Sequence, residues 1–269
     1  MGWEYLWILF SVCAVLSAVG FYKFVYFLSI GYGFAIAGGS IAVMILALTG
    51  GMAAGQEWLL FLQTALFVAY GARLSGFLLV RELKNAAYRK KLREATGGDK
   101  KMPFFVMLVI WLSVAVLYTA QLTPVFFRYY NRETGGVALW LIGVGISVLG
   151  LILEQVGDNQ KTAQKREAPD RVAMRGLYRM VRCPNYFGEI VFWTGVFVAG
   201  IPAYRGAGQW ITAALAYLCL VYIMINGAQR LDRRQEKRYG DDPEYRAYAD
   251  HTPILFPLLP IYHIGKYKD

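Results

Sequence analysis

The chain has 269 residues, of which 57% are hydrophobic and 17% are charged, and its formal net charge is +10. A soluble domain of this length carries about 25% charged residues, so the composition excludes an ordinary soluble protein. The basic residues lie between apolar segments rather than in a separate module, which argues against a nucleic-acid partner. Basic cytoplasmic loops of a membrane protein explain the positive charge instead.

Cysteine and histidine are too sparse for metal or disulfide chemistry. Cys13 and Cys219 lie inside apolar runs, Cys183 stands alone, and the two histidines, His251 and His263, are near the C-terminus. No spacing typical of a metal site or of a disulfide framework emerges. We therefore expect no metal and no histidine-based hydrolase.

Seven apolar segments approach or exceed the length of about 20 residues that crosses a bilayer. They cover residues 3–21, 24–49, 58–80, 103–126, 136–156, 185–203 and 208–228. The sequence predicts an all-α, polytopic membrane bundle of seven transmembrane helices.

Loop charge indicates the orientation of the bundle. Residues 81–101, residues 157–184 and the tail after 228 hold eight, seven and eight basic residues. The three connections that alternate with them hold none, two and one. Because basic loops stay in the cytoplasm, we expect an external N-terminus and a cytoplasmic C-terminus. In a bacterium this would be an inner-membrane protein.

The third apolar segment carries Tyr70, Arg73 and Phe77 at helical spacing, so the three side chains are expected on one side of a helix. Arg73 has two interpretations. It extends to the membrane surface, or it points with Tyr70 into a polar cavity. The second is favoured because a hydroxyl and a cation then converge.

The fifth segment leaves the membrane through Glu154, Asp158, Lys161 and Lys165, which are spaced 4, 3 and 4 residues apart. This spacing forms one helical face that passes from acids to bases. Ion pairs within the helix would explain it, and so would a ligand that carries hydroxyls, amides and phosphates. Further hydrogen-bonding groups surround the same turns, namely Gln155, Asn159, Gln160 and Gln164.

A run of arginines follows, comprising Arg166, Arg171, Arg175, Arg179 and Arg182. Guanidinium groups match phosphate geometry, so we expect two or three of them to contact phosphate. Arg230 and Arg234, after the last apolar segment, are one helical turn apart and could reach the same ligand. No Rossmann or P-loop fingerprint is present, which argues against those modes of nucleotide binding.

Residues 176–189 read Gly-Leu-Tyr-Arg-Met-Val-Arg-Cys-Pro-Asn-Tyr-Phe-Gly-Glu. Asn185, Gly188 and Glu189 share one helical face. Glu189 thus places an acid at the mouth of a membrane segment, where charge is costly and usually functional.

This motif resembles the C-terminal signature of the steroid 5α-reductase and sterol-reductase superfamily. Tyr70-x-x-Arg73 is similar to the substrate-side tyrosine and arginine of the steroid 5α-reductases. Other positions that match the superfamily are Asp158, Gln160, Lys165, Asp232, Lys237, Tyr239, Gly240 and Tyr248.

The resemblance implies a membrane reductase that transfers hydride from NADPH to the activated C=C of a lipophilic enone, such as a 3-oxo-Δ4-steroid. Tyr70 would act on the substrate carbonyl, with Arg73 and Phe77 beside the substrate. The implied cofactor-binding residues are Glu154, Asp158, Lys165, Arg166, Arg179, Asn185, Gly188, Glu189, Arg230 and Arg234. Asn185 and Glu189 would bind the nicotinamide carboxamide, and the surplus of Arg and Lys favours NADPH over NADH.

The implied division of labour assigns residues 1–101 to the substrate side and 102–269 to the cofactor, with the active site on the cytoplasmic side. The expected partners are a lipophilic small molecule and membrane lipids, without nucleic acid; the oligomeric state is not predicted.

Two alternatives remain open. One is an S-adenosylmethionine-dependent methyltransferase of the isoprenylcysteine or phospholipid type. Such enzymes tend to carry paired glutamates after the last span, where this chain has Leu231-Asp232-Arg233-Arg234. The other is a non-enzymatic lipid-binding scaffold, which leaves Asn185 and Glu189 without a purpose.

Overall fold

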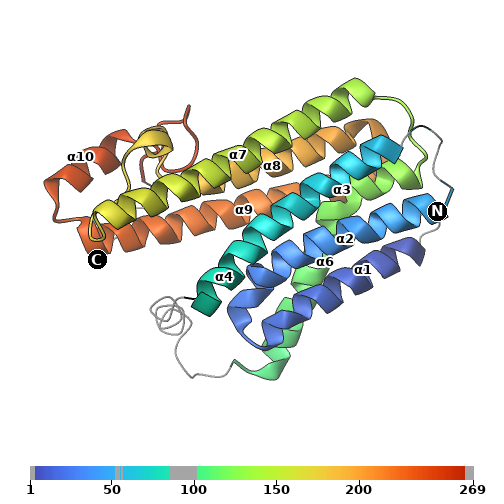
Figure 1. Cartoon of the computed structure of the whole chain (residues 1–269), viewed down its shortest axis with the longest axis horizontal. Helices are drawn as coiled ribbons and strands as arrows, with labels where there is room; N and C mark the ends of the chain where they lie inside the picture. The colour runs from blue at the N-terminus through green and yellow to red at the C-terminus, as the bar shows by residue number, and fades with distance from the viewer. Residues whose placement is uncertain (1–3, 52–54, 56, 85–101, 264–269) are drawn as a thin grey trace. The chain divides into compact units, whose positions relative to one another are not determined.

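The computed structural model describes residues 4–51, 55, 57–84 and 102–263. Within these residues the chain is helical and contains no strand (Figure 1). It forms two compact units, and each is described by itself. The first comprises residues 1–140 and 200–216, and the second comprises residues 141–199 and 217–269.

The first unit is built around one central helix. Its helices are α1 (Glu4–Ser17), α2 (Ile30–Thr49), α3 (Glu57–Gly71), α4 (Phe77–Lys84) and α6 (Phe104–Tyr130). α2 contacts α1, α3 and α6 (Figure 1). Two 3₁₀ turns, η1 (Ala18–Phe21) and η2 (Phe24–Leu28), lead from α1 into α2. A third, η5 (Ile201–Ala203), packs against α6.

A π-helical segment, η3 (Ala72–Gly76), separates α3 from α4. A π turn closes its hydrogen bonds over five residues instead of four and so holds an extra residue. The predicted face of Tyr70, Arg73 and Phe77 assumed unbroken α-helical spacing, and that assumption was wrong at this turn. Ser75 ties the segment to α2, since its hydroxyl donates to the carbonyl of Ile30 at 2.6 Å.

An ion pair holds the helix that follows the π segment. Lys23, in the connection between η1 and η2, pairs with Glu82 of α4. The ammonium of Lys23 also lies over the ring of Tyr26, 5.5 Å from its centroid. The ion pair between Glu82 and Lys23 therefore depends on the orientation of α4 after the π segment.

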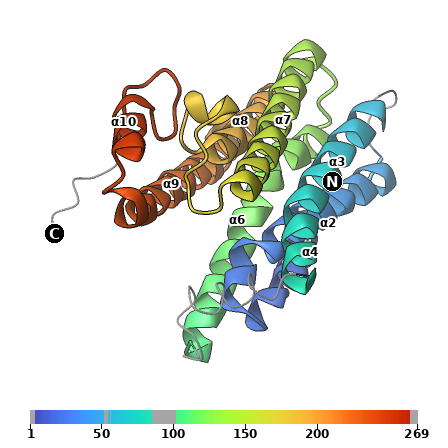
Figure 2. The same ribbon diagram turned by 60° about the vertical axis from the view of Figure 1, so that its left-hand side comes forward.

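The second unit contains most of α7 (Val137–Glu167), α8 (Pro184–Gly200), most of α9 (Gly206–Tyr239) and α10 (Pro243–His251). A 3₁₀ turn, η4 (Gly176–Arg179), lies between α7 and α8. Both ribbon views show α7 and α8 running side by side (Figures 1 and 2).

α7 and α8 approach each other through glycines spaced seven residues apart on each helix. A Cβ atom added to Gly150 would lie 2.6 Å from the carbonyl oxygen of Gly188, and one added to Gly195 would lie 2.4 Å from that of Gly143. Between these contacts, Ser147 donates to an α8 carbonyl at 2.9 Å. Small residues allow such backbone contact between membrane helices, and here no side chain fits between them.

The membrane prediction is confirmed for the fold. Within the described residues, seven helices are long and apolar enough to cross a bilayer. The second begins at Ile30 rather than residue 24, because Phe24–Leu28 forms the η2 turn. The fifth and seventh continue to Glu167 and Tyr239, past the predicted membrane boundaries. The orientation of the termini and the functional division at residue 101 stay predictions.

The glycine contact can be tested on two glycines of one helix. Gly150→Ala is expected to lower the melting temperature in detergent by several degrees, because overpacking costs about 1–3 kcal/mol and each kcal/mol shifts the melting temperature by about 2–4 °C. Gly145→Ala is the matched control, since a Cβ there meets nothing within 4 Å. Equal melting temperatures for the two variants would contradict the contact.

Candidate functional site

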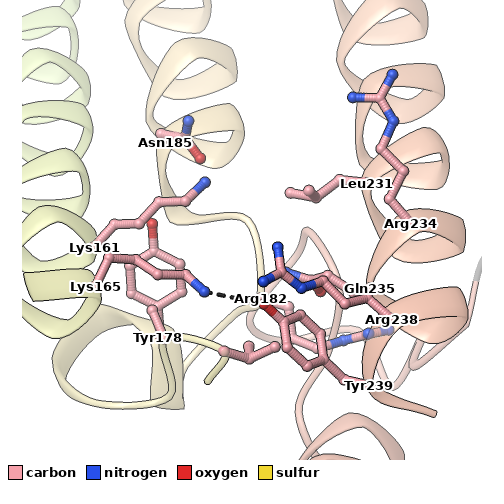
Figure 3. Close-up of a pocket in the computed structure, with 12 residues that line it drawn as sticks. Lys161, Lys165, Tyr178, Arg182, Asn185, Leu231, Arg234, Gln235, Arg238 and Tyr239 are labelled. Carbon is pink, nitrogen blue, oxygen red and sulfur yellow. Dashed lines mark hydrogen bonds between the residues drawn. The ribbon is translucent and has the colours of Figure 1, made fainter. Parts of the chain in front are cut away.

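A pocket of about 200 Å³ lies in the second unit, between α7, the start of α8 and the last turns of α9 (Figure 3). None of the lining residues that the structure describes is acidic. Five of them are cations, namely Lys161, Lys165, Arg182, Arg234 and Arg238. The pocket therefore suits an anionic ligand, and the hydrogen bonds of each cation decide which are available to it.

The loop that forms one wall of the pocket is held by two glutamines of α7. The Gln164 Oε1 atom accepts hydrogen bonds from the backbone N–H groups of residues 174–175, both at 2.9 Å. The Gln160 Oε1 atom accepts from the N–H of Leu177 at 2.8 Å. Gly176 has a positive φ of 69°, and a Cβ there would lie 2.4 Å from Gln160. These amides brace the loop, so the interpretation of both as ligand groups is not supported.

Arg182 makes its contacts within the protein and therefore stabilises the fold. Its guanidinium donates to Asp232 at 2.6 Å, and both side chains are buried, with 1% and 0% exposed. It also donates to the carbonyl of Tyr262. Two backbone hydrogen bonds of 2.9 Å join residues 182–183 to residues 253–254. The motif before α8 is thus fastened to the segment that follows α10.

Two further cations at the pocket have partners within the protein. Lys165 donates to the hydroxyl of Tyr239 at 3.1 Å and to the carbonyl of Pro169 at 3.2 Å. Arg238 pairs with Asp170 at 2.9 Å, and its guanidinium lies over the ring of Tyr239. These contacts join the end of α9 to the loop after α7 and leave the two charges at the rim of the pocket.

Lys161 and Arg234 are different, since neither makes an ion pair or a side-chain hydrogen bond within the part of the chain that the structure describes. Lys161 extends from α7, and Arg234 belongs to α9 (Figure 3). Asn185 lies at the first turn of α8, where unpaired backbone N–H groups favour negative charge. These residues supply the available positive charge and the amide of the pocket.

Two titratable side chains near the pocket, Tyr178 and Cys183, are neutral. Burial raises the pKa of the Tyr178 hydroxyl, so it stays protonated and donates to the carbonyl of Gly157 at 3.4 Å. Burial also raises the pKa of the Cys183 thiol to about 12. A thiol with that pKa is not a nucleophile at neutral pH, and Cys183 packs in the hydrophobic core instead.

Two buried acids flank the glycine contact. Glu189 is 5% exposed, and its carboxylate accepts from the Trp193 indole at 3.1 Å. Glu154 is 2% exposed, and its side chain covers Gly188, where a Cβ would lie 2.7 Å from the Glu154 Cγ atom. Gly188, predicted to bind a cofactor, is therefore occupied in packing against α7. Asp158 lies one turn beyond Glu154 and is half-buried.

The pocket brings together three of the residues predicted from the sequence, Lys165, Asn185 and Arg234. Arg166, Arg179 and Arg230 are exposed and do not line it, so their contact with a cofactor stays a prediction. The prediction gave no site role to four other lining residues, Gln235, Arg238, Tyr239 and Tyr178, although Tyr239 was among the positions that match the superfamily. A usable signal existed for Arg238, which continues the four-residue spacing of Arg230 and Arg234.

Tyr70 belongs to the first unit, where it is completely buried among aromatic rings. Its ring lies edge-on to that of Tyr32, with centroids 5.9 Å apart. Tyr32 stacks on Tyr118 at 4.9 Å, and its hydroxyl accepts from the Gln121 amide at 3.4 Å. Sequence reasoning missed Tyr32, Tyr118 and Gln121, although polar groups within apolar segments are a signal. Arg73 lies half-buried in the π segment.

The side chain of Phe77, the third predicted residue of this face, lies outside the described residues.

A family model described as "Protein of unknown function (DUF1295)" matches residues 32–252, which include both the Tyr70 cluster and the pocket. The chain belongs to the DUF1295 family. It is also 24% identical over 174 residues to 3-oxo-5-alpha-steroid 4-dehydrogenase 1 of Bos taurus. That match covers 60% of this chain and 59% of the relative's length. No solved structure matches.

These two findings confirm the predicted steroid 5α-reductase superfamily. The motif that carried the prediction, residues 176–189, lies within the family match. The seven membrane-capable helices identify this DUF1295 protein as an integral membrane protein.

The buried ion pair of this DUF1295 protein gives a stability prediction. Asp232→Asn keeps the shape of the side chain but leaves Arg182 buried without a counter-charge, which typically costs about 3–5 kcal/mol. We expect a large loss of thermal stability in detergent. Asp170→Asn removes the exposed partner of Arg238 and should change stability little, because exposed pairs contribute little. Similar effects of both changes would contradict the structural role of Arg182.

Proposed function

We propose that this protein is an NADPH-dependent membrane reductase that transfers hydride to the activated C=C of a lipophilic enone such as a 3-oxo-Δ4-steroid. Membership of the superfamily and the name of the bovine relative support the reaction class. The concentration of basic residues in the predicted cytoplasmic loops supports cofactor entry from the cytoplasm.

One observation carries the choice of cofactor. Among the described residues, the pocket lining has five cations and no acid, and two of those cations, Lys161 and Arg234, have no ion pair. Lys and Arg bind phosphate strongly, so the donor set fits the phosphates of a dinucleotide. The extra phosphate of NADPH gives one more anionic group to bind. Lys165 and Arg238 would add charge at the rim.

The same observation disfavours the methyltransferase alternative. S-adenosylmethionine carries a sulfonium and an ammonium against a single carboxylate, so its net charge is positive. Lys161 and Arg234, which have no ion pair in the described chain, favour an anionic ligand over a molecule with a net positive charge. The choice between the two cofactors therefore rests on the sign of the ligand's charge.

The polar residues beside the pocket have distinct proposed roles. Asn185 offers both a donor and acceptors to the nicotinamide carboxamide, and Glu189 offers acceptors to its N–H groups. Glu154 and Asp158 would accept hydrogen bonds from hydroxyls on the adenosine side. Gly188 acts indirectly, because its close packing against α7 keeps Glu154 near Glu189.

NADPH supplies the hydride when bound, and the chain's own residues act on the substrate. The Tyr70 hydroxyl donates a hydrogen bond to the enone carbonyl, which makes the β-carbon electrophilic and stabilises the enolate that develops. The α-carbon of the enolate then takes up a proton that comes ultimately from solvent, which restores the carbonyl and completes the reduction. Complete burial of Tyr70 among aromatic rings keeps water away from that carbonyl.

The cofactor assignment predicts that Lys161→Gln and Arg234→Gln each weaken NADPH binding about tenfold or more, because a charge-assisted hydrogen bond contributes about 1.5–3 kcal/mol. Titration by thermal shift in detergent measures this. Arg233→Gln is the matched control, as an exposed neighbour on α9 that does not line the pocket. Stabilisation of the wild-type protein by S-adenosylmethionine but not by NADPH would establish the methyltransferase alternative instead.

The role of Tyr70 is tested separately. We expect Tyr70→Phe to bind NADPH as the wild type does and to lose enone reduction by about 100-fold or more, since removal of one oxyanion-stabilising donor has that effect in other enzymes. Steady-state NADPH oxidation with a 3-oxo-Δ4-steroid measures it. Full turnover by this variant would refute the assigned role.

A further inference from the structure

Gln63, in the middle of α3, presents an unusual polar group inside a membrane-spanning helix. It is 1% exposed. Neither its amide oxygen nor its amide nitrogen has a hydrogen-bond partner in the part of the chain that the structure describes. Burying such an amide unpaired is costly, and polar groups within a membrane are usually functional. The amide thus calls for a ligand.

The position of Gln63 relates it to Tyr70. Seven residues separate them, which is close to two full turns, so both side chains leave α3 on the same face. At 1.5 Å per residue the two positions are about 10 Å apart along the helix. The completely buried ring of Phe67 lies between them in sequence. The face is therefore polar at both ends and apolar in the middle.

A second buried glutamine of the first unit, Gln121, differs from Gln63 in having a hydrogen-bond partner within the described residues. Gln121 is also buried in the first unit, but its amide nitrogen donates to the hydroxyl of Tyr32. That bond gives Gln121 a part in the aromatic cluster around Tyr70. Gln63 has no such hydrogen bond among the described residues, although it occupies the same face of α3 as the proposed catalytic hydroxyl.

We propose that Gln63 is a specificity-determining residue that hydrogen-bonds a second oxygen of the substrate, about 10 Å from the carbonyl bound by Tyr70. The inference rests on the proposed function. The Gln63 amide donates to a carbonyl and accepts from a hydroxyl, so either group would serve. A rigid, apolar molecule with an oxygen at each end, such as a 3,17-dioxygenated steroid, has a comparable spacing between its oxygens.

Such an arrangement has a measurable signature. A site that hydrogen-bonds a substrate oxygen discriminates against an analogue without it, because the protein's own polar group then stays unpaired. We expect the wild-type protein to prefer 4-androstene-3,17-dione over 4-androsten-3-one by at least about tenfold in kcat/KM. The two steroids differ only in the distal oxygen, so hydride transfer itself is common to both.

The experiment compares wild-type protein with Gln63→Leu and Gln63→Met in detergent with NADPH. Steroid affinity is measured by quenching of tryptophan fluorescence, and kcat/KM by NADPH oxidation. Both variants should lose the preference, with weaker binding of the dione and unchanged handling of the 17-deoxy steroid. Without steroid, both should melt at or above the wild-type temperature, because an unpaired buried amide has been removed.

The outcomes separate this inference from the proposed function. Reduction of both steroids with a preference that survives in both variants would overturn the role of Gln63 and leave the reductase standing. Binding that discriminates through Gln63 without any reduction would support the role and overturn the reductase. Equal losses on the two steroids, or failure of both to bind to wild-type protein, would overturn the assigned specificity.

Discussion

The backbone contact between α7 and α8 is the constraint on which the candidate cofactor site depends. Gly150 and Gly188 allow the two helices to approach so closely that a methyl group does not fit between them. Both buried acids, Glu154 and Glu189, owe their position to this contact, because one covers Gly188 and the other follows it. The same contact fixes the position of the first turn of α8, which carries Asn185, relative to α7. A larger distance between α7 and α8 would separate Glu154 and Glu189 from Asn185 and would enlarge the pocket.

The cations of the second unit divide into those that build the pocket and those that remain available within it. Arg182 is neutralised by Asp232 in the interior, and Arg238 and Lys165 hold the surrounding loop. Lys161 and Arg234 keep their charge for a ligand. Net charge alone conceals this division, since a buried pair contributes structure but no attraction for an anion. The affinity of the pocket thus depends on very few of the protein's many basic residues.

The seven membrane-capable helices were predictable because hydropathy is a local property of the chain and the bilayer imposes a fixed span length. The motif at 176–189 likewise pointed to Asn185, which lines the pocket, while the cofactor role of Glu189 stays a prediction. The sequence did not predict the roles of Gln160, Gln164 and Arg182. Whether such a side chain bonds to the backbone, to an acid or to a ligand depends on which groups the fold places beside it. The extra residue of the π segment is equally invisible in apolar periodicity, and it breaks the α-helical spacing assumed for Tyr70, Arg73 and Phe77.

That π segment has a consequence for comparing relatives of this protein. One residue corresponds to about 100° of rotation in an α-helix. The π turn absorbs this rotation, so loss of a single residue from Ala72–Gly76 would restore regular α-helix and leave α4 on the same face, with Glu82 still beside Lys23. A one-residue gap at this place in a sequence alignment would therefore record a change of helix type, with the face presented by α4 and the number of membrane crossings unaltered.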